Sequence, residues 1–209
     1  TNAASVDFTV TFSESVTNVD ISDFSLTTNI GGASITNVSN VDPFYIVTAN
    51  TAFDSGNLRL DLIDNDSIMN NSGRPLGTVG IGNGNFVNGE TYTIDKAVPI
   101  VTSIIRASPN PTSASSVDFI VTFSESVSGV DSFDFSLNTI GISGASITNV
   151  NSVDPFYIVT VNPGAGTGTI SLDLSDDDSI SDVAGNKLGG LGVGNANLIT
   201  GETYNMSRM

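Results

Sequence analysis

The segment SVDFTVTFSESV at residues 5–16 returns almost unchanged as SVDFIVTFSESV at residues 116–127. In the second copy the apolar residues Val117, Phe119 and Val121 stand at every other position, with mostly polar residues between them. Alternation with a period of two is typical of a β-strand with one buried face. The segment therefore predicts a half-buried strand, and its recurrence predicts two copies of one fold.

The repeat extends along most of the chain at an offset of 111 or 112 residues. This period is the size of an independent domain, not of a solenoid unit, and it predicts two tandem modules, residues 1–96 and 97–209. The first module has no counterpart of AVPIVTSIIRASPNP at 97–111, whose alternation predicts a leading strand. The other matching segments are GASITNV at 32–38 and 144–150, LDLIDNDSI at 60–68 and LDLSDDDSI at 172–180, and NGETY at 88–92 and TGETY at 200–204.

Short alternating runs separated by turn residues continue through the second module, and helical periodicity is absent. With a leading strand at 98–106, they give about seven strands, the signature of an antiparallel sandwich. The predicted fold class is all-β: two tandem immunoglobulin-like antiparallel β-sandwiches, the first lacking its leading strand. The further predicted runs are 133–137, 145–150, 157–161, 170–174 and a last strand from about 203.

Composition excludes several classes of function. Six Lys and Arg stand against 22 Asp and Glu, a net charge of −16, whereas nucleic acids and anionic membranes are bound by basic patches. The chain has no Cys and no His, which excludes disulfides, thiol catalysis, the Ser-His-Asp triad and the usual zinc sites. No apolar run reaches the roughly 18 residues of a membrane span, so no membrane insertion is expected.

The acidic residues of the loops gather at one predicted end of each module, except for Asp54 at the other end of the first. If the strands alternate in direction, three segments meet at this end: the end of the second strand, the end of the sixth, and the connection between the fourth and fifth. The linker residue Asp95 lies at the same end of the second module. Several carboxylates close together repel one another, and Ca²⁺ binds six to eight oxygen ligands. The sequence therefore predicts a calcium site. The candidate ligands are Asp95, Glu125, Asp131, Asp154, Asp176, Asp178 and Asp182 in the second module, and Glu14, Asp64, Asp66 and Asn70 in the first.

Two features of these loops bear on that prediction. The pairs Asp64-x-Asp66 and Asp176-x-Asp178 would place two carboxylates on one side of an extended loop. The glycine-rich segments 77–85 and 189–197 resemble calcium-binding β-roll repeats only weakly, and we expect a long mobile loop there. The alternative to calcium is that Asp and Asn favour turns and that acidic loops keep the protein in solution.

The order of these motifs resembles the bacterial Ig-like, cadherin-like tandem repeats of large extracellular adhesin-type proteins. The segments that carry it are the VxFxVTFSExV, GASITNV and SISDxAGNxL motifs. The resemblance implies an extracellular or cell-surface location, a spacer or adhesive role, often with calcium, and neighbouring copies of the repeat in a longer chain. The first module departs from the pattern, because NNSGRPL at 70–76 stands where the second has DVAGNKL at 182–188.

We therefore expect a non-catalytic pair of extracellular modules, a spacer or adhesion repeat stiffened by calcium, with an unidentified protein or glycan ligand. The alternative is a carbohydrate-binding accessory module of a secreted enzyme, which a glycan array would distinguish. Paired carboxylates could also serve a glycosidase. Aromatic side chains that stack on sugars are few, since the chain has no Trp and four Tyr, and we expect no enzyme.

Overall fold

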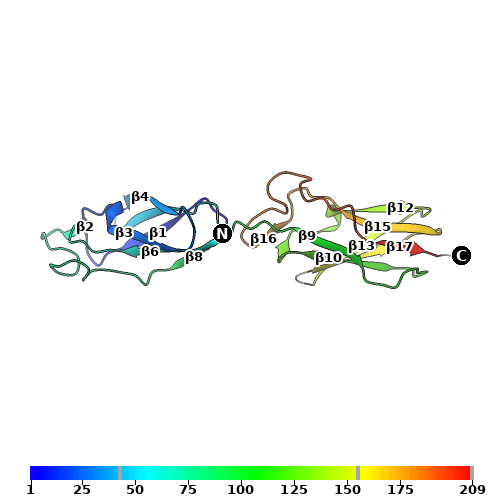
Figure 1. Cartoon of the computed structure of the whole chain (residues 1–209), viewed down its shortest axis with the longest axis horizontal. Coiled ribbons are helices and arrows are strands. Elements are labelled where there is room, and N and C mark those ends of the chain that lie inside the picture. The colour runs from blue at the N-terminus through cyan, green and yellow to red at the C-terminus, as the bar shows by residue number, and fades with distance from the viewer. Residues whose placement is uncertain (42–43, 154–155, 208–209) are drawn as a thin grey trace. The chain divides into compact units, whose positions relative to one another are not determined.

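The computed structural model describes residues 1–41, 44–153 and 156–207, and it divides into two compact units, Thr1–Lys96 and Ala97–Met209 (Figure 1). Each unit has its own hydrophobic core. The core of the first includes Val47 and Leu58, and that of the second includes Phe119 and Leu172. None of the helices in the described part of the chain is long and apolar enough to cross a membrane.

The second unit is an antiparallel sandwich of two sheets, with strand orders β13-β14-β10-β9 and β12-β15-β17. If its main strands are lettered A to G in chain order, the sheets contain D-E-B-A and C-F-G, the arrangement of a constant-type immunoglobulin domain. The prediction of an immunoglobulin-like sandwich is confirmed. The strands are β9 (Val101–Arg106), β10 (Val117–Phe123), β12 (Phe135–Ile140), β13 (Ser146–Val153), β14 (Phe156–Asn162), β15 (Gly168–Leu174) and β17 (Thr203–Met206).

The first unit repeats this topology with strand orders β1-β5-β4 and β3-β6-β8. Strand β1 corresponds to β10, but no described residue forms a strand on its outer edge, where β9 lies in the second unit. The prediction that the first sandwich lacks its leading strand is therefore confirmed. The strands are β1 (Ser5–Thr11), β3 (Phe24–Thr28), β4 (Ser34–Val41), β5 (Phe44–Asn50), β6 (Gly56–Leu62) and β8 (Thr91–Ile94).

Short strands bring the acidic loops of each unit together. In the second unit β11 (Val127–Ser128), which follows β10, pairs with β16 (Ser181–Asp182), which follows β15. In the first unit β2 (Val16–Thr17) pairs in the same way with β7 (Met69–Asn70). The segments that carry most of the candidate ligands therefore meet at one end of each sandwich.

One predicted strand begins later than the sequence pattern suggests. Residues Ser132–Asp134 form a 3₁₀ helix, η2, and the strand begins at Phe135. The carboxylate of Asp131 accepts the backbone N–H of Phe133 at 2.7 Å, and that of Asp134 accepts the N–H of Asp131 at 2.6 Å. This reciprocal capping favours a helical turn over an extended strand. Ile21–Asp23 forms the equivalent helix η1 in the first unit.

We expect the first unit to unfold before the second. The outer edge of β1 is unpaired, and Val10 and Phe12 are only partly buried, whereas Val121 is fully buried and Phe123 is 3% exposed. An open edge and uncovered apolar surface both lower stability. Limited proteolysis of the whole chain should therefore cut within residues 1–90 first. Earlier cleavage inside 100–209 would contradict this expectation.

Candidate functional site

The loop after β15 is a tight turn stabilised by the first of its acids. Asp176 is 6% exposed, and its Oδ1 accepts the backbone N–H of Asp178 at 3.1 Å. Asp178 has a φ of +65°, a left-handed conformation that Asp tolerates better than most residues. The two residues therefore belong to a compact turn, and the predicted extended conformation of this loop is wrong.

The acids of this turn hold the glycine-rich loop. The carboxylate of Asp178 accepts the N–H of Gly192 at 3.0 Å, and the main-chain oxygen of Asp176 accepts the N–H of Gly194 at 2.8 Å. The N–H of Asp176 in turn donates to the side-chain oxygen of Asn197 at 2.7 Å. Gly192 has a φ of +120°, which residues with a Cβ rarely adopt. The loop is thus joined to the acidic turn by hydrogen bonds, and the mobility expected from its composition stays a prediction.

The first unit builds the same arrangement. The carboxylate of Asp66 accepts the N–H of Gly80 at 3.0 Å, and the main-chain oxygen of Asp64 accepts the N–H of Gly82 at 3.0 Å. The side-chain oxygen of Asn85 accepts the N–H of Asp64 at 2.7 Å. The D-x-D pair and the glycine-rich segment are therefore partners in one structural element. Their joint recurrence in both modules is the sequence signal that could have revealed this.

The two units differ at one carboxylate oxygen. In the first unit Oδ2 of Asp64 accepts the N–H of Gly84 at 3.1 Å. In the second unit Ala196 occupies the position of Gly84, and Oδ2 of Asp176 is buried with no hydrogen-bond partner among the described residues. A buried, unsatisfied carboxylate oxygen is costly unless something compensates its charge.

Asp182 forms the next turn. It is 4% exposed, and its Oδ1 accepts the backbone N–H groups of Gly185 and Asn186 at 2.7 and 2.8 Å, while Oδ2 accepts the side-chain amide of Asn186 at 2.8 Å. In the first unit Asn70 has this place, and its amide oxygen accepts the N–H groups of Ser72 and Arg74, both at 3.0 Å. Its Nδ2 donates to Glu14 at 3.1 Å. An amide thus forms the same turn without a charge.

Asp134 is a buried acid of this end that the sequence analysis missed. It is 2% exposed, caps η2, and accepts the hydroxyl of Ser179 at 2.9 Å. Burial raises the pKa of the Asp134 carboxyl above its ordinary value. The segment DFSL that contains it occurs at the same place in both modules, which is the signal that could have identified it.

The remaining candidates are placed as follows. Glu125 follows β10 and is half-buried, and Asp131 is exposed. Asp95 belongs to the first unit, where its N–H donates to the oxygen of Thr1 at 2.9 Å and its carboxylate accepts the hydroxyl of Ser55 at 3.3 Å. Asp154 lies outside the described residues. We also compared the distances between carboxylate oxygens within each unit. Among the described residues of either unit taken alone, no group of three acids has one oxygen from each acid within 4.8 Å of the other two.

Comparisons with known proteins add little to this geometry. No protein-family model matches the sequence, and no curated protein matches it. Among solved structures the chain is similar to FdeC, an adhesin of Escherichia coli, at 14% identity and a TM-score of 0.38, over 97% of this chain and 65% of the FdeC chain. At so low a TM-score the assignment of an immunoglobulin-like fold depends on the strand order of the chain itself.

Proposed function

We propose that the chain is a pair of non-catalytic structural modules, a spacer or adhesive repeat of an extracellular or cell-surface protein. The observation that carries this proposal is the use of the loop acids. A catalytic carboxylate must exchange a proton or form a bond with a substrate, whereas Asp66, Asp178 and Asp182 accept backbone N–H groups of their own loops. The resemblance to adhesin-type repeats supports the extracellular setting and the adhesive role.

A glycan array probed with the whole chain tests this proposal against the carbohydrate-binding alternative. Since a spacer has no sugar site, we expect no glycan to be retained above the level of a denatured sample of the same chain. Binding to one defined class of glycan would favour an accessory module of a secreted enzyme and overturn the spacer proposal.

We also propose that Ca²⁺ binds at the acidic end of the second unit. The specific support is Oδ2 of Asp176, a buried carboxylate oxygen to which no group in the described part of the chain donates a hydrogen bond. Hard cations such as Ca²⁺ are bound through carboxylate and carbonyl oxygens. In the first unit the N–H of Gly84 already satisfies the equivalent oxygen of Asp64, so the support applies to the second unit alone. The other ligands, Glu125, Asp131, Asp178, Asp182, Asp95 and Asp154, remain sequence-based predictions, because no three carboxylates in the described part of this unit bring their oxygens within 4.8 Å of one another.

Calcium should raise the melting temperature of the second unit. At a calcium concentration 100 times the Kd, binding adds about 2.7 kcal/mol of stability, which corresponds to about 10 °C or more for a domain of this size. Calorimetry of the whole chain with calcium and with a chelator measures the shift. Asp176→Asn should abolish it, and the matched change Asp64→Asn in the first unit should leave it intact. No shift in the unsubstituted chain would contradict calcium binding but not the spacer role.

A further inference from the structure

The connection before the last strand of the first unit is a bulge. Leu62, at the end of β6, is bridged to Phe86, and Arg59 of the same strand pairs with Thr91 of β8. Between these two points β6 advances by three residues and the other segment by five. Residues 87–90 therefore cannot pair with β6 one for one, and the bulge leaves main-chain groups outside the hydrogen-bond ladder.

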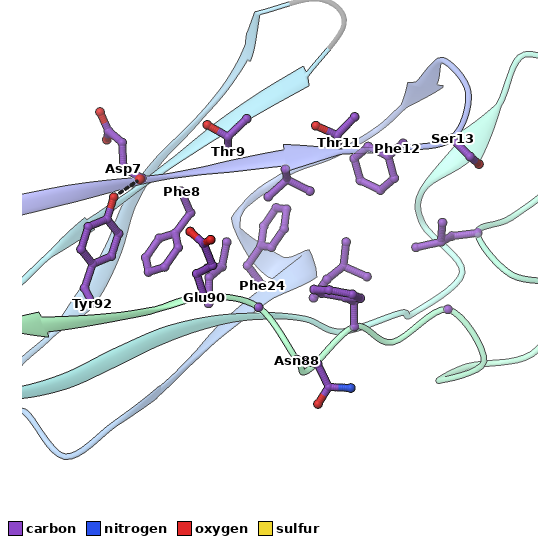
Figure 2. Close-up of a pocket in the computed structure, with 17 residues that line it drawn as sticks. Asp7, Phe8, Thr9, Thr11, Phe12, Ser13, Phe24, Asn88, Glu90 and Tyr92 are labelled. Carbon is purple, nitrogen blue, oxygen red and sulfur yellow. Dashed lines mark hydrogen bonds between the residues drawn. The ribbon is translucent and has the colours of Figure 1, made fainter.

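An Asn-Gly pair, Asn88 and Gly89, lies in this bulge. Asn88 is exposed, and its side-chain amide points away from Phe8 and Phe24 (Figure 2). In the described part of the chain, no hydrogen bond holds the Asn88 side chain, and the N–H of Gly89 donates none. The side-chain amide of Asn88 and the backbone nitrogen of Gly89 can therefore approach each other without first breaking a bond.

These two groups are the reactants of deamidation. The backbone nitrogen of Gly89 attacks Cγ of Asn88, the new N–Cγ bond closes a succinimide ring, and Nδ2 leaves as ammonia with the proton of that nitrogen. Water then adds to either ring carbonyl and opens the ring to aspartate or to its β-linked isomer, isoaspartate. Glycine favours the attack, because it has no Cβ to hinder its nitrogen and its backbone rotates easily. The reaction needs only water.

The other Asn-Gly pair of the chain, Asn83 and Gly84, is held by hydrogen bonds. Oδ1 of Asn83 accepts the N–H of Thr78 at 2.9 Å, and Nδ2 of Asn83 donates to the main-chain oxygen of Thr78 at 3.0 Å. The N–H of Gly84 donates to the carboxylate of Asp64 at 3.1 Å. Because the ring cannot close until these bonds break, the same dipeptide is protected in the glycine-rich loop.

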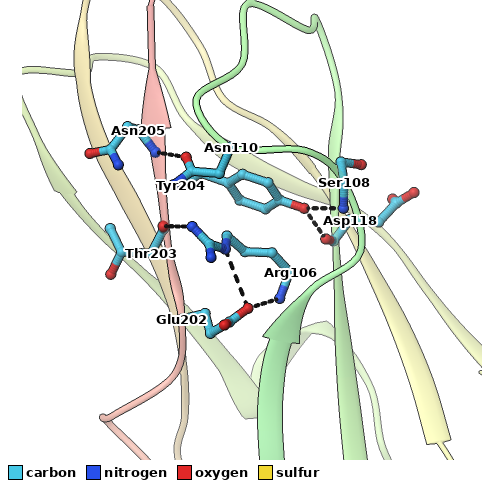
Figure 3. Close-up of polar contacts among 8 residues, drawn as sticks. All are labelled: Arg106, Ser108, Asn110, Asp118, Glu202, Thr203, Tyr204 and Asn205. Carbon is cyan, nitrogen blue, oxygen red and sulfur yellow. Dashed lines mark hydrogen bonds and ion pairs between the residues drawn. The ribbon is translucent and has the colours of Figure 1, made fainter.

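The second unit shows that the exposure of this position does not come from the open edge of β1. The same bulge occurs there at residues 199–202, with Thr200 in the place of Asn88. The carboxylate of Glu202 accepts the N–H of Arg106 in β9 at 2.8 Å and pairs with its guanidinium at 3.3 Å (Figure 3). Thr200 is exposed although β9 contacts this segment. The position is therefore open to solvent with a neighbouring strand in place.

We propose that Asn88 is a site of spontaneous deamidation, and that the fold directs the reaction to Asn88 while it protects Asn83. Both products place a new carboxylate on the bulge, and isoaspartate also lengthens its main chain by one carbon. The equivalent position of the second unit does not change, because Thr200 has no amide. The chain therefore acquires negative charge with time at one position of its first module.

Incubation of the whole chain in mildly alkaline water labelled with heavy oxygen, followed by peptide mass spectrometry, tests the proposal. We expect labelled aspartate and isoaspartate at position 88, formed about tenfold or more faster than at position 83, where hydrogen bonds must first break. In denaturant the two positions should react at similar rates, since both are Asn-Gly. Asn88→Gln should stay unmodified, because glutamine must close a larger ring. Thr200→Asn should create a new reactive position beside an intact β9.

Three results would overturn the proposal: an unmodified Asn88, equal rates at positions 83 and 88 in the folded chain, or the same preference for position 88 in denaturant. The last would mean that the neighbouring residues in the sequence, and not the fold, select Asn88. A Thr200→Asn variant that melts like the unsubstituted chain but does not react would overturn the assigned role of the bulge. None of these outcomes depends on calcium or on the result of the glycan array.

Discussion

Replacement of Phe119 by Ala is expected to lower the free energy of unfolding of the second unit by about 3–5 kcal/mol. The ring is fully buried in the core of the second unit and packs edge-on against Tyr204, with ring centroids 5.1 Å apart. The change removes buried apolar surface and an aromatic pair, and it leaves a cavity that neighbouring strands cannot easily close. Calorimetry of the whole chain should show one of two transitions moving to lower temperature.

Phe8→Ala is the matched control in the first unit. Phe8 makes the same edge-on contact with Tyr92, also at 5.1 Å, but it is 9% exposed and lines an apolar groove of about 660 Å³ beside β1. Because water reaches part of this site already, the loss of stability should be smaller than for Phe119→Ala. An equal or larger loss would contradict the conclusion that the groove leaves the first core incompletely covered.

The fold could be predicted from the sequence because each of its main determinants is local or repeated. The alternation in residues 117–123 fixes which side chains of β10 face the core, and burial alternates there as expected. The offset of the repeat predicts a second copy, and the missing counterpart of 97–111 predicts the open edge. These features depend on a period of two and on self-similarity, which are visible in one chain.

The sequence predicts at which end of each sandwich the acidic residues gather, but not the hydrogen bonds that they make there. The carboxylate of Asp178 bonds the N–H of Gly192, 14 residues away, and such a bond between a side chain and the backbone leaves no periodicity in the sequence. The cap of η2 by Asp131 ended a strand pattern that alternation alone would extend to Phe133.

Replacement of Asp182 by Ala should cost the second unit about 3 kcal/mol or more. The buried carboxylate accepts two backbone N–H groups and the amide of Asn186, and each buried donor left without a partner costs about 1–3 kcal/mol. Denaturant unfolding in the presence of a chelator measures this loss without any contribution from calcium. Asp177→Ala is the control, because Asp177 is exposed and its carboxylate accepts the N–H of the neighbouring exposed residue Ser179.

Asp182→Asn tests whether residue 182 needs its negative charge, or only a side-chain oxygen that accepts the N–H groups of the turn. An amide oxygen forms the same turn at Asn70 in the first unit, so the variant should lose little more than the contact with Asn186 when a chelator is present. If calcium also uses Asp182, the variant will melt like the unsubstituted chain in chelator and lose its shift when calcium is added. A loss as large as that of Asp182→Ala in chelator would instead show that the turn requires the charge itself, which would contradict the equivalence of the two turns.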